Sequence, residues 1–408
     1  MRIVYHCEDV VGARMAGPGI RAVELARRLS ASGRHQVTLV APGADTLANE
    51  PFQTGELSAL RTAEAFISQG FGFPLRHLLR FKGRVVLDLY DPVQLEHLAR
   101  FGPQATAEQR ISLAVLRRRL LYLLSRADHV LCASPAQRAL WLGWLGACGR
   151  LDPDALAGDP EARRLLAVVP FGIPEIAPAR AGSPLRTAIR ASANDRVALW
   201  AGGLWDWMDP ALAVRALAIA REQVPDLRLA LLAGQRPGAA AMQMTAAASE
   251  ARAVAGPGVH FIDDWVPYEE RGAWLLDANL AVSAHKPSLE AELAFRTRLL
   301  DCLWAALPAA CTSGDVLAAE GERQGWARLA PPGDAPALAS AMVALCGADR
   351  NQHARSAARE AAAQRTWQRS AGVLLALLEG EAPRRQPLTR APGMAIAFAR
   401  KAFRKLTR

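Results

Sequence analysis

Apolar residues in the first 170 positions form short continuous runs that alternate with longer stretches of helical spacing. Short runs of this kind are typical of strands buried on both faces of a parallel sheet, and apolar positions three and four residues apart predict amphipathic helices. The predicted strands cover 2–7, 36–41, 85–89, 129–133 and 166–169, and the predicted helices cover 19–32, 93–100, 106–125 and 135–147. Strands separated by helices predict a doubly wound α/β domain.

The same alternation returns in the second half after an interruption. Residues 173–194 are rich in Pro, Ala, Gly and Ser and predict an interdomain linker. Beyond them, strands are predicted at 197–201, 227–233, 259–262, 280–283, 309–312 and 327–330, and helices at 210–223, 238–254, 268–276, 291–306, 315–323, 335–346 and 350–379.

The fold class predicted from this pattern is α/β, with two doubly wound Rossmann-like domains that face each other across a cleft. The expected division is an N-terminal Rossmann-like domain over 1–175, a linker over 176–194, a C-terminal Rossmann-like domain over 195–379 and a tail over 380–408. Ligands of such sheets bind beyond the carboxyl ends of the strands, so the cleft is the expected site.

Composition changes this picture little. The chain of 408 residues is 51% hydrophobic, yet no apolar run approaches the roughly 18 residues that a membrane-spanning helix needs. The first residues lack the pattern of a signal peptide, so a cytoplasmic protein is expected. Six cysteines are scattered singly without metal-ligand spacing, which predicts free thiols and no metal site.

Positive charge is concentrated at the end of the chain. Residues 381–408 hold eight basic residues against Glu381, which accounts for +7 of the net charge of +10 and argues against nucleic acid as a partner. Residues 394–408 predict a helix with an apolar arc opposite a basic one, which suits an anionic membrane surface. The alternatives are a helix docked on the first domain and a solvated tail.

Gly17 and Gly19 open the first predicted helix in a sequence that fits G-x-G-x-x-A. A dinucleotide site is not expected, because nine residues separate Cys7 from Gly17 and Pro18 removes one backbone donor. The start of a helix still favours anions, so an acceptor or phosphate loop and an ordinary turn are both possible.

Asp88 and Asp91 end the strongest strand of the first half. Either carboxylate could contact acceptor hydroxyls or serve as a base at the cleft. The competing interpretation is that Asp91 caps the helix that starts near Pro92.

Gly202 and Gly203 follow the first strand of the second domain, and Trp205 and Trp207 come directly after them. Paired glycines let a ligand approach the backbone closely, and an indole can stack on a base or a sugar face. The alternative is that the tryptophans pack at a domain interface.

The densest group of polar residues follows the strand at 280–283 and opens the next helix. Two arginines there could neutralise a diphosphate, and the carboxylates could accept hydrogen bonds from ribose or sugar hydroxyls. The alternative is a solvated helix start with an Arg298–Asp301 pair. The candidate donor-site residues are His285, Lys286, Glu290, Glu292, Phe295, Arg296, Arg298 and Asp301.

Three stretches, 17–42, 258–284 and 290–315, resemble the nucleotide-sugar glycosyltransferases of retaining family 4, which have the two-domain GT-B fold. The resemblance covers about residues 1–380. It implies that Glu290 or Glu292 takes the first acidic place of the family's donor motif. It also implies that Asp301 takes the second acidic place and binds the nucleotide ribose.

The chain departs from the family pattern in two respects. Eight residues separate Glu292 from Asp301 where the family has seven, and the second acid is Asp rather than Glu. The Arg and Lys expected after the first strand of the second domain are absent. Counter-charge for a diphosphate is then expected from Arg296, Arg298 or Lys286.

These observations predict a retaining, metal-independent glycosyltransferase in which Asp91, Arg296 and Glu290 are catalytic. The expected substrates are a nucleoside diphosphate sugar and a sugar or lipid-linked acceptor of cell-envelope polysaccharide assembly, and no cofactor is expected. The alternatives are a nucleotide-sugar epimerase and a non-catalytic sugar-nucleotide-binding protein of the same fold.

Overall fold

The computed structural model describes residues 1–70, 72–73, 75–102, 104–234 and 246–382. The basic amphipathic helix expected at 394–408 lies outside the described residues, as does most of the tail. Within the described part of the chain, no helix combines the length and the apolar character that crossing a membrane requires.

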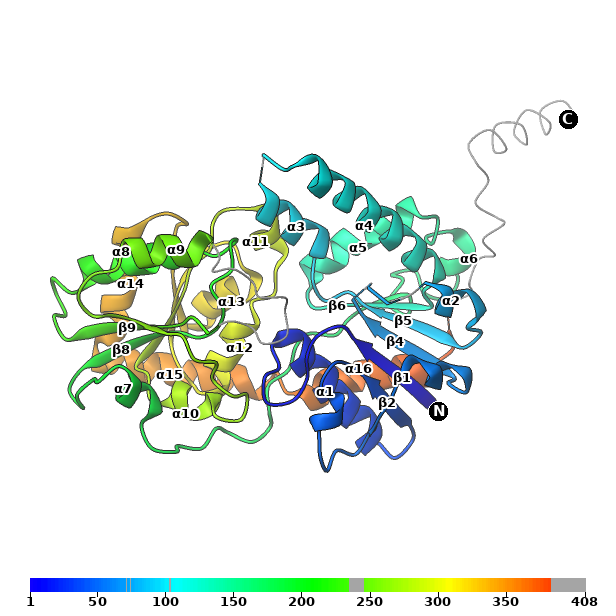
Figure 1. Cartoon of the computed structure of the whole chain (residues 1–408), viewed down its shortest axis with the longest axis horizontal. Coiled ribbons are helices and arrows are strands. Elements are labelled where there is room, and N and C mark those ends of the chain that lie inside the picture. Colours follow the sequence, from blue (N-terminus) through cyan, green and yellow to red (C-terminus); the bar gives the residue numbers. More distant parts are fainter. Residues whose placement is uncertain (71, 74, 103, 235–245, 383–408) are drawn as a thin grey trace, which may run out of the picture.

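The first half of the chain forms a sheet of seven strands that are all parallel, in the order β3-β2-β1-β4-β5-β6-β7 (Figure 1). The strands at the centre are buried on both faces, as their continuous apolar sequences require. The strands are β1 (Arg2–Cys7), β2 (Gln36–Val40), β3 (Gln53–Thr54), β4 (Ala65–Gln69), β5 (Arg84–Asp88), β6 (His129–Cys132) and β7 (Leu166–Val168).

Helices connect these strands and cover the sheet. Helix α1 buries its apolar stripe against β1 and β2, and α4 and α5 pack near β5, β6 and β7. Their bounds are α1 (Gly17–Ala31), α2 (Arg76–Arg80), α3 (Val93–Phe101), α4 (Ala107–Arg126), α5 (Pro135–Ala147) and α6 (Pro153–Leu156), with short 3₁₀ turns at Ala44–Thr46 and Leu57–Arg61.

The second half forms a parallel sheet of six strands in the order β10-β9-β8-β11-β12-β13. Its strands are β8 (Arg196–Trp200), β9 (Leu227–Leu232), β10 (Val259–Ile262), β11 (Leu280–Ser283), β12 (Ala309–Thr312) and β13 (Ala327–Ala330). Its helices are α8 (Pro210–Ala220), α9 (Ala246–Ala253), α10 (Arg271–Leu276), α11 (Leu289–Leu293), α12 (Thr297–Trp304), α13 (Val316–Gln324), α14 (Ala335–Cys346) and α15 (Ala348–Ala363). The two parallel sheets with flanking helices confirm the predicted fold class.

Several details differ from the sequence-based expectation, and the short helices α2 and α6 are among the elements that were not predicted. Strands β3 and β4 lie in a stretch without a predicted strand, and a short helix α7 (Pro184–Ala188) interrupts the predicted linker. The single helix expected over 291–306 is two helices, because Ala294 adopts an extended conformation after α11. The long helix expected over 350–379 is also divided, and its second part is α16 (Trp367–Glu379).

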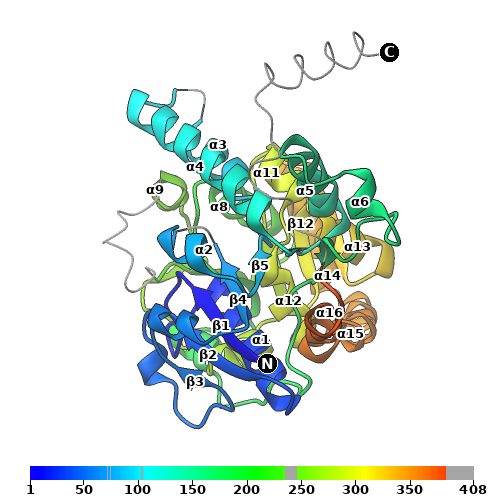
Figure 2. The same ribbon diagram turned by 90° about the vertical axis from the view of Figure 1, so that its right-hand side faces the viewer.

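Helix α16 returns to the first half of the molecule, although the pattern grouped it with residues 195–379. It packs against α1, and the Arg84 guanidinium donates hydrogen bonds to the carbonyls of Leu377, Leu378 and Gly380. In Figure 1 the orange helices α15 and α16 follow one another from the second sheet to the first, and Figure 2 shows this line end-on.

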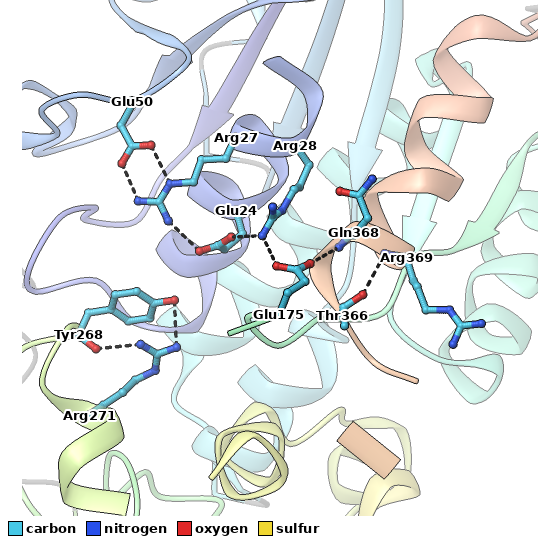
Figure 3. A network of polar contacts seen from close by, with 10 residues as sticks. All are labelled: Glu24, Arg27, Arg28, Glu50, Glu175, Tyr268, Arg271, Thr366, Gln368 and Arg369. Carbon is cyan, nitrogen blue, oxygen red and sulfur yellow. Dashed lines mark hydrogen bonds and ion pairs between the residues drawn. The ribbon is translucent and has the colours of Figure 1, made fainter. Parts of the chain in front are cut away.

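The two chain crossings between the halves are bonded to each other. The N–H of Ile173 donates to the Arg365 carbonyl, and the Ile173 carbonyl accepts the N–H of Trp367, on either side of an isolated bridge to Thr366. Glu175 accepts the N–H of Gln368 at 2.9 Å and pairs with Arg28 of α1 at 2.5 Å, as Figure 3 shows. These contacts tie both crossings to the first half.

Candidate functional site

A cavity of about 550 Å³ opens between the two sheets. Its walls come from the start of α1, the ends of β8, β9 and β10, helix α10 and the start of α12. Six of the residues singled out from the sequence line it, namely Gly17, Gly202, Gly203, Trp205, Arg298 and Asp301. The structure therefore brings candidates from both halves of the chain to one cleft.

The amino-terminal ends of α1 and α12 meet at this cavity. A Cβ on Gly17 would lie 3.5 Å from the hydroxyl oxygen of Thr297, the first residue of α12. Ala16 provides no side-chain cap for α1, and Thr297 also lines the cavity. The first N–H groups of a helix lack partners within it, so two such ends create a site that attracts anions.

Arg298 brings a full positive charge to the same place. Its Nη2 donates to the carbonyl of Gly203 at 3.1 Å, whereas Nη1 has no hydrogen-bond partner among the described residues. Burial lowers the pKa of Arg298 to about 10, and nearby Arg296 adds to this shift. A desolvated cation without a counter-charge is costly, so this site is suited to a ligand that carries negative charge.

Gly202 allows the arginine to lie this close to the backbone. Its φ of +128° is in a region that side chains rarely adopt, and an added Cβ would lie 3.6 Å from the Arg298 Cζ. The next loop residues, Trp205 and Trp207, stack on each other with ring centroids 5.7 Å apart. Trp205 lies over Gly203 and lines the cavity, so its ring forms part of the wall.

Three further tryptophans that line the cavity were not predicted as site residues, and one of them is Trp367 at the start of α16. Trp265, after β10, and Trp274, on α10, line the cavity, and neither indole N–H has a hydrogen-bond partner in the described part of the chain. Buried N–H donors normally bond to an acceptor, so an acceptor-rich ligand suits this wall. The available sequence signal was the concentration of large aromatic residues over 265–274.

Asp301 faces the cavity and pairs with Arg271 rather than with Arg298. The Arg271 Nε lies 3.3 Å from the Asp301 Oδ1, and the Asp301 side chain remains 33% exposed. Burial raises the pKa of Asp301, and the Arg271 charge opposes this rise. The alternative of an Arg298–Asp301 pair on a solvated helix start is therefore wrong.

A second polar group spans the cleft and joins the two halves. Arg296 donates to both Glu290 oxygens, at 2.9 and 2.7 Å, and this pair is almost fully buried. Asp91 and Glu96 face the pair from the first half, where α3 contacts α11, and their carboxyl groups share a hydrogen bond. Three carboxyl groups thus surround one guanidinium.

Burial and the closeness of other carboxyl groups favour the protonated forms of Asp91 and Glu96. Burial, and after it the Glu290 carboxylate, raises the pKa of Asp91 to about 6. Burial also raises the pKa of Glu96, with Asp91 as the second cause. Carboxyl groups that titrate near neutrality can accept or donate protons in catalysis. Glu96 was missed in the sequence, although it lies in the first turn of the helix after Asp91.

Asp88 does not belong to the site. Arg21 of α1 donates to both of its oxygens, at 2.8 and 2.7 Å, and the Tyr5 hydroxyl donates at 3.0 Å. The Asp88 side chain is fully buried. The predicted acceptor contact of Asp88 is therefore corrected, because its carboxylate joins α1 to the sheet and is closed to a ligand.

Gly19 also has a structural position. A Cβ there would lie 2.5 Å from the carbonyl oxygen of Val10 and 3.0 Å from the Cβ of Met15. The residue is buried, and it lets the loop before α1 pack on the helix. Of the two glycines predicted for the acceptor or phosphate loop, only Gly17 lines the cavity.

Substitution of Gly19 by Ala is expected to lower the free energy of unfolding, although Ala is the better helix former. The added methyl group must displace backbone atoms, which costs about 1–3 kcal/mol. Gly143 in α5 is the matched control, since a Cβ added there would meet no other described part of the chain within 4 Å. There Gly143→Ala is expected to stabilise by up to about 1 kcal/mol. Urea unfolding compares the two, and equal effects would contradict the assignment.

The remaining candidates lie around the site without lining the cavity. His285 is buried beside Gly314, and burial lowers its pKa to about 4, with Arg296 adding to the effect. Phe295 stacks on Phe171 of the first half at 6.3 Å. Lys286 and Glu292 are exposed, and Lys286 approaches Glu250 at 3.9 Å. Of the three cations proposed for a diphosphate, Arg298 alone lines the cavity.

Comparisons with known proteins identify the architecture. No family model and no curated protein matches the sequence. Among solved structures, sucrose-phosphate synthase from Thermosynechococcus elongatus is 16% identical, with a TM-score of 0.64 over 92% of this chain and 98% of its own. HepE from Anabaena, in complex with UDP and glucose, is 14% identical, with a TM-score of 0.66 over 93% and 99%. The chain has the GT-B fold.

A third GT-B neighbour is WaaG, a glycosyltransferase involved in lipopolysaccharide biosynthesis. It is 13% identical, with a TM-score of 0.65 over 93% of this chain and 100% of its own. At these identities the likeness shows the fold alone, which is the fold that the sequence resemblance implied. Within the ranges that the structure describes, no three His, Cys, Asp or Glu side chains are grouped to hold a metal ion.

Proposed function

We propose that the protein transfers a sugar from a nucleoside diphosphate sugar to an acceptor bound against the first sheet. The observation that carries this proposal is Arg298, a desolvated cation without a carboxylate partner among the described residues. It lies in a cavity walled by two helix N-termini, and a diphosphate would supply the charge that it lacks. HepE, a neighbour in fold, is described in complex with UDP-glucose, which supports the same donor class.

In this proposal the sugar is transferred with retention and without a metal ion. The bond from the anomeric carbon to the diphosphate breaks as the acceptor oxygen bonds to the same face, and the leaving phosphate takes the acceptor proton. Arg298 and the ends of α1 and α12 stabilise the charge that develops on the diphosphate. Asp301 accepts hydrogen bonds from the ribose.

The carboxyl cluster is proposed to orient the sugar and the acceptor. Asp91 belongs to the first half, and its ionised carboxylate accepts a hydrogen bond from a hydroxyl of the acceptor. Glu290 is held rigidly by Arg296 and faces the same place from the second half. A site built from rigid groups keeps the reacting atoms aligned.

Thermal shift against UDP-, GDP- and dTDP-sugars tests the donor class. A cognate nucleotide is expected to raise the Tm. At a hundredfold excess over Kd, binding adds about 2.7 kcal/mol to the free energy of unfolding. Release of the nucleoside diphosphate in the presence of acceptor, with the product anomer assigned by NMR, then tests transfer and retention. Absence of a Tm change with every nucleotide tested would contradict the proposal.

The carboxyl cluster also favours one alternative, a nucleotide-sugar epimerase. Such an enzyme needs several acid and base groups in the cleft, and Asp91, Glu96 and Glu290 are grouped where α3 of the first half contacts α11 of the second. Incubation with nucleotide sugars and no acceptor separates the two activities. Epimerised donor would favour the alternative, and unchanged donor favours transfer.

We further propose a cytoplasmic enzyme at the inner face of the cell membrane, acting on a lipid-linked acceptor in cell-envelope polysaccharide assembly. The support is the basic amphipathic sequence of residues 394–408, together with the role of WaaG in lipopolysaccharide biosynthesis. Sedimentation with anionic liposomes, with and without residues 381–408, tests the membrane contact. Equal sedimentation of both forms would contradict it.

A pH profile tests the role given to Asp91. The value of kcat/KM is expected to fall as the pH decreases through about 6, because protonation removes the hydrogen-bond acceptor. Asp91→Asn is expected to be slow and to lack this acid limb. Glu96→Leu removes a hydrogen bond that lowers the Asp91 pKa, so its limb is expected at higher pH. If Asp91→Asn kept the acid limb at the wild-type pH, Asp91 would not be the group whose protonation causes it.

A further inference from the structure

Arg271 is held in one orientation at the edge of the cavity. Its guanidinium lies close to two aromatic rings, with Cζ 3.7 Å from the centroid of Tyr268 and 4.4 Å from that of Trp304. Its Nη1 donates to the Tyr268 carbonyl at 2.8 Å, and Nη2 donates to the Tyr268 hydroxyl at 3.1 Å, as Figure 3 shows. Stacking and a planar fork of donors leave the group little freedom.

A third donor of Arg271, the Nε–H group, is directed at Asp301. Nε approaches Oδ1 at 3.3 Å, so the carboxylate is oriented from one side only. Each carboxylate oxygen can accept two hydrogen bonds, so Asp301 keeps capacity for at least two further donors. Asp301 is partly exposed and lines the cavity, so a ligand bound in the cavity can supply those donors.

The charge of Arg271 also affects the ionisation of Asp301. Burial raises the pKa of this carboxyl, and Arg271 is the cation that opposes the rise. Among the other cations near α12, Arg355 of α15 donates to the carbonyls of Ala278, Asn279 and Ala306 instead. Asp301 therefore depends on Arg271 both for its orientation and for its charge.

We propose that Arg271 is a positioning residue that holds Asp301 ready for the two vicinal ribose hydroxyls, and so makes the site select ribonucleoside over 2′-deoxyribonucleoside diphosphates. This inference rests on the proposed function, because it takes the nucleotide to lie in the same cavity. A fixed carboxylate accepts two hydroxyls side by side. A 2′-deoxyribose leaves one of these hydrogen bonds unmade, and sites built on such bonds discriminate strongly.

Calorimetric Kd values for UDP and 2′-deoxy-UDP, and for GDP and 2′-deoxy-GDP, test the inference. For the nucleotide that binds, wild-type protein is expected to prefer the ribose form about tenfold or more, the scale of one hydrogen bond to a charged group. R271Q and D301N are expected to bind the ribose and deoxyribose forms alike. R271K keeps a cation without the fork and is expected to keep part of the preference.

The ratio of the two Kd values separates positioning from general structural support. A merely structural loss in R271Q would weaken both nucleotides equally and preserve the ratio, which would overturn the inference. The matched control is R228Q, which breaks the 2.9 Å pair between Arg228 and Asp195 at the amino-terminal ends of β8 and β9. This variant should keep the wild-type ratio. The double variant R271Q/D301N should equal D301N, because the two residues act as a unit.

Two other outcomes are also decisive. If no nucleoside diphosphate binds wild-type protein, the proposed function fails. If the nucleotides bind and R271Q retains the wild-type ratio, only the role of Arg271 fails. Should R271Q not fold, R271K is compared with D301N, and a wild-type ratio in R271K overturns the inference.

Discussion

Replacement of Arg298 by Met is expected to lower kcat/KM for sugar transfer by roughly 10²–10³-fold, the usual effect of removing one donor to a developing oxyanion. The same variant is expected to have an unchanged or higher Tm without ligand. Arg298 is desolvated and has no carboxylate partner in the described structure, so it destabilises the free protein. Steady-state kinetics and thermal unfolding of the ligand-free protein measure the two effects.

Opposite signs for stability and activity distinguish a ligand-binding cation from a structural one. Arg228→Met is the matched control, because Arg228 is buried to a similar extent and pairs with Asp195 far from the cavity. This control should lose stability and keep its kcat/KM. If Arg298→Met lost stability in the same way and kept its activity, Arg298 would be a structural residue.

The positions of most strands follow from the hydrophobic pattern, and the exceptions have a physical reason. Central strands such as β5 and β11 are buried on both faces and appear as apolar runs. Strand β4 is equally buried, but its sequence Ala-Phe-Ile-Ser-Gln ends in polar residues. Ser68 and Gln69 lie inside the protein, which a rule based on apolar runs does not detect.

The break between α11 and α12 could not be predicted, because residues 289–304 contain no Pro or Gly. Tertiary contacts make the break instead. The N–H of Arg296 bonds to Asp315, and its side chain returns to Glu290 six residues earlier. The break places the first turn of α12, with Arg298, at the cavity. Helical periodicity gave the correct residues for the site and the wrong geometry for the segment that carries them.

The candidate site was predictable where one segment carries it and unpredictable where distant segments meet. Arg298 and Asp301 lie on one helix and were predicted together. Arg271 acts through Asp301, 30 positions away in the sequence, and Glu96 meets Glu290, 194 positions away, as well as its near neighbour Asp91. Asp88 shows the converse error, because a carboxylate at the end of a strand is equally suited to pairing with a buried arginine.

Loss of either partner of the Glu290–Arg296 pair is expected to cost about 3–5 kcal/mol, since each leaves a buried charged group without its hydrogen-bonded partner. Urea unfolding of E290L and R296M measures this cost. The double variant E290L/R296M replaces both charges with apolar groups of similar size and should be far less destabilised than the sum of the two. An additive double variant would show that the two residues do not form one buried unit.

The same two variants should shift the acid limb of the pH profile in opposite directions. Glu290 raises the pKa of Asp91, and Arg296 lowers it. E290L should therefore keep Asp91 ionised to lower pH, so the limb that is expected near pH 6 for wild-type protein moves down. R296M leaves the carboxyl groups without their cation, so the limb moves up. Destabilisation alone changes activity at every pH and shifts neither limb in a chosen direction. If both variants shifted the limb in the same direction, the group that titrates would not be Asp91 beside the Glu290–Arg296 pair. This conclusion would hold even if both variants lost the expected stability.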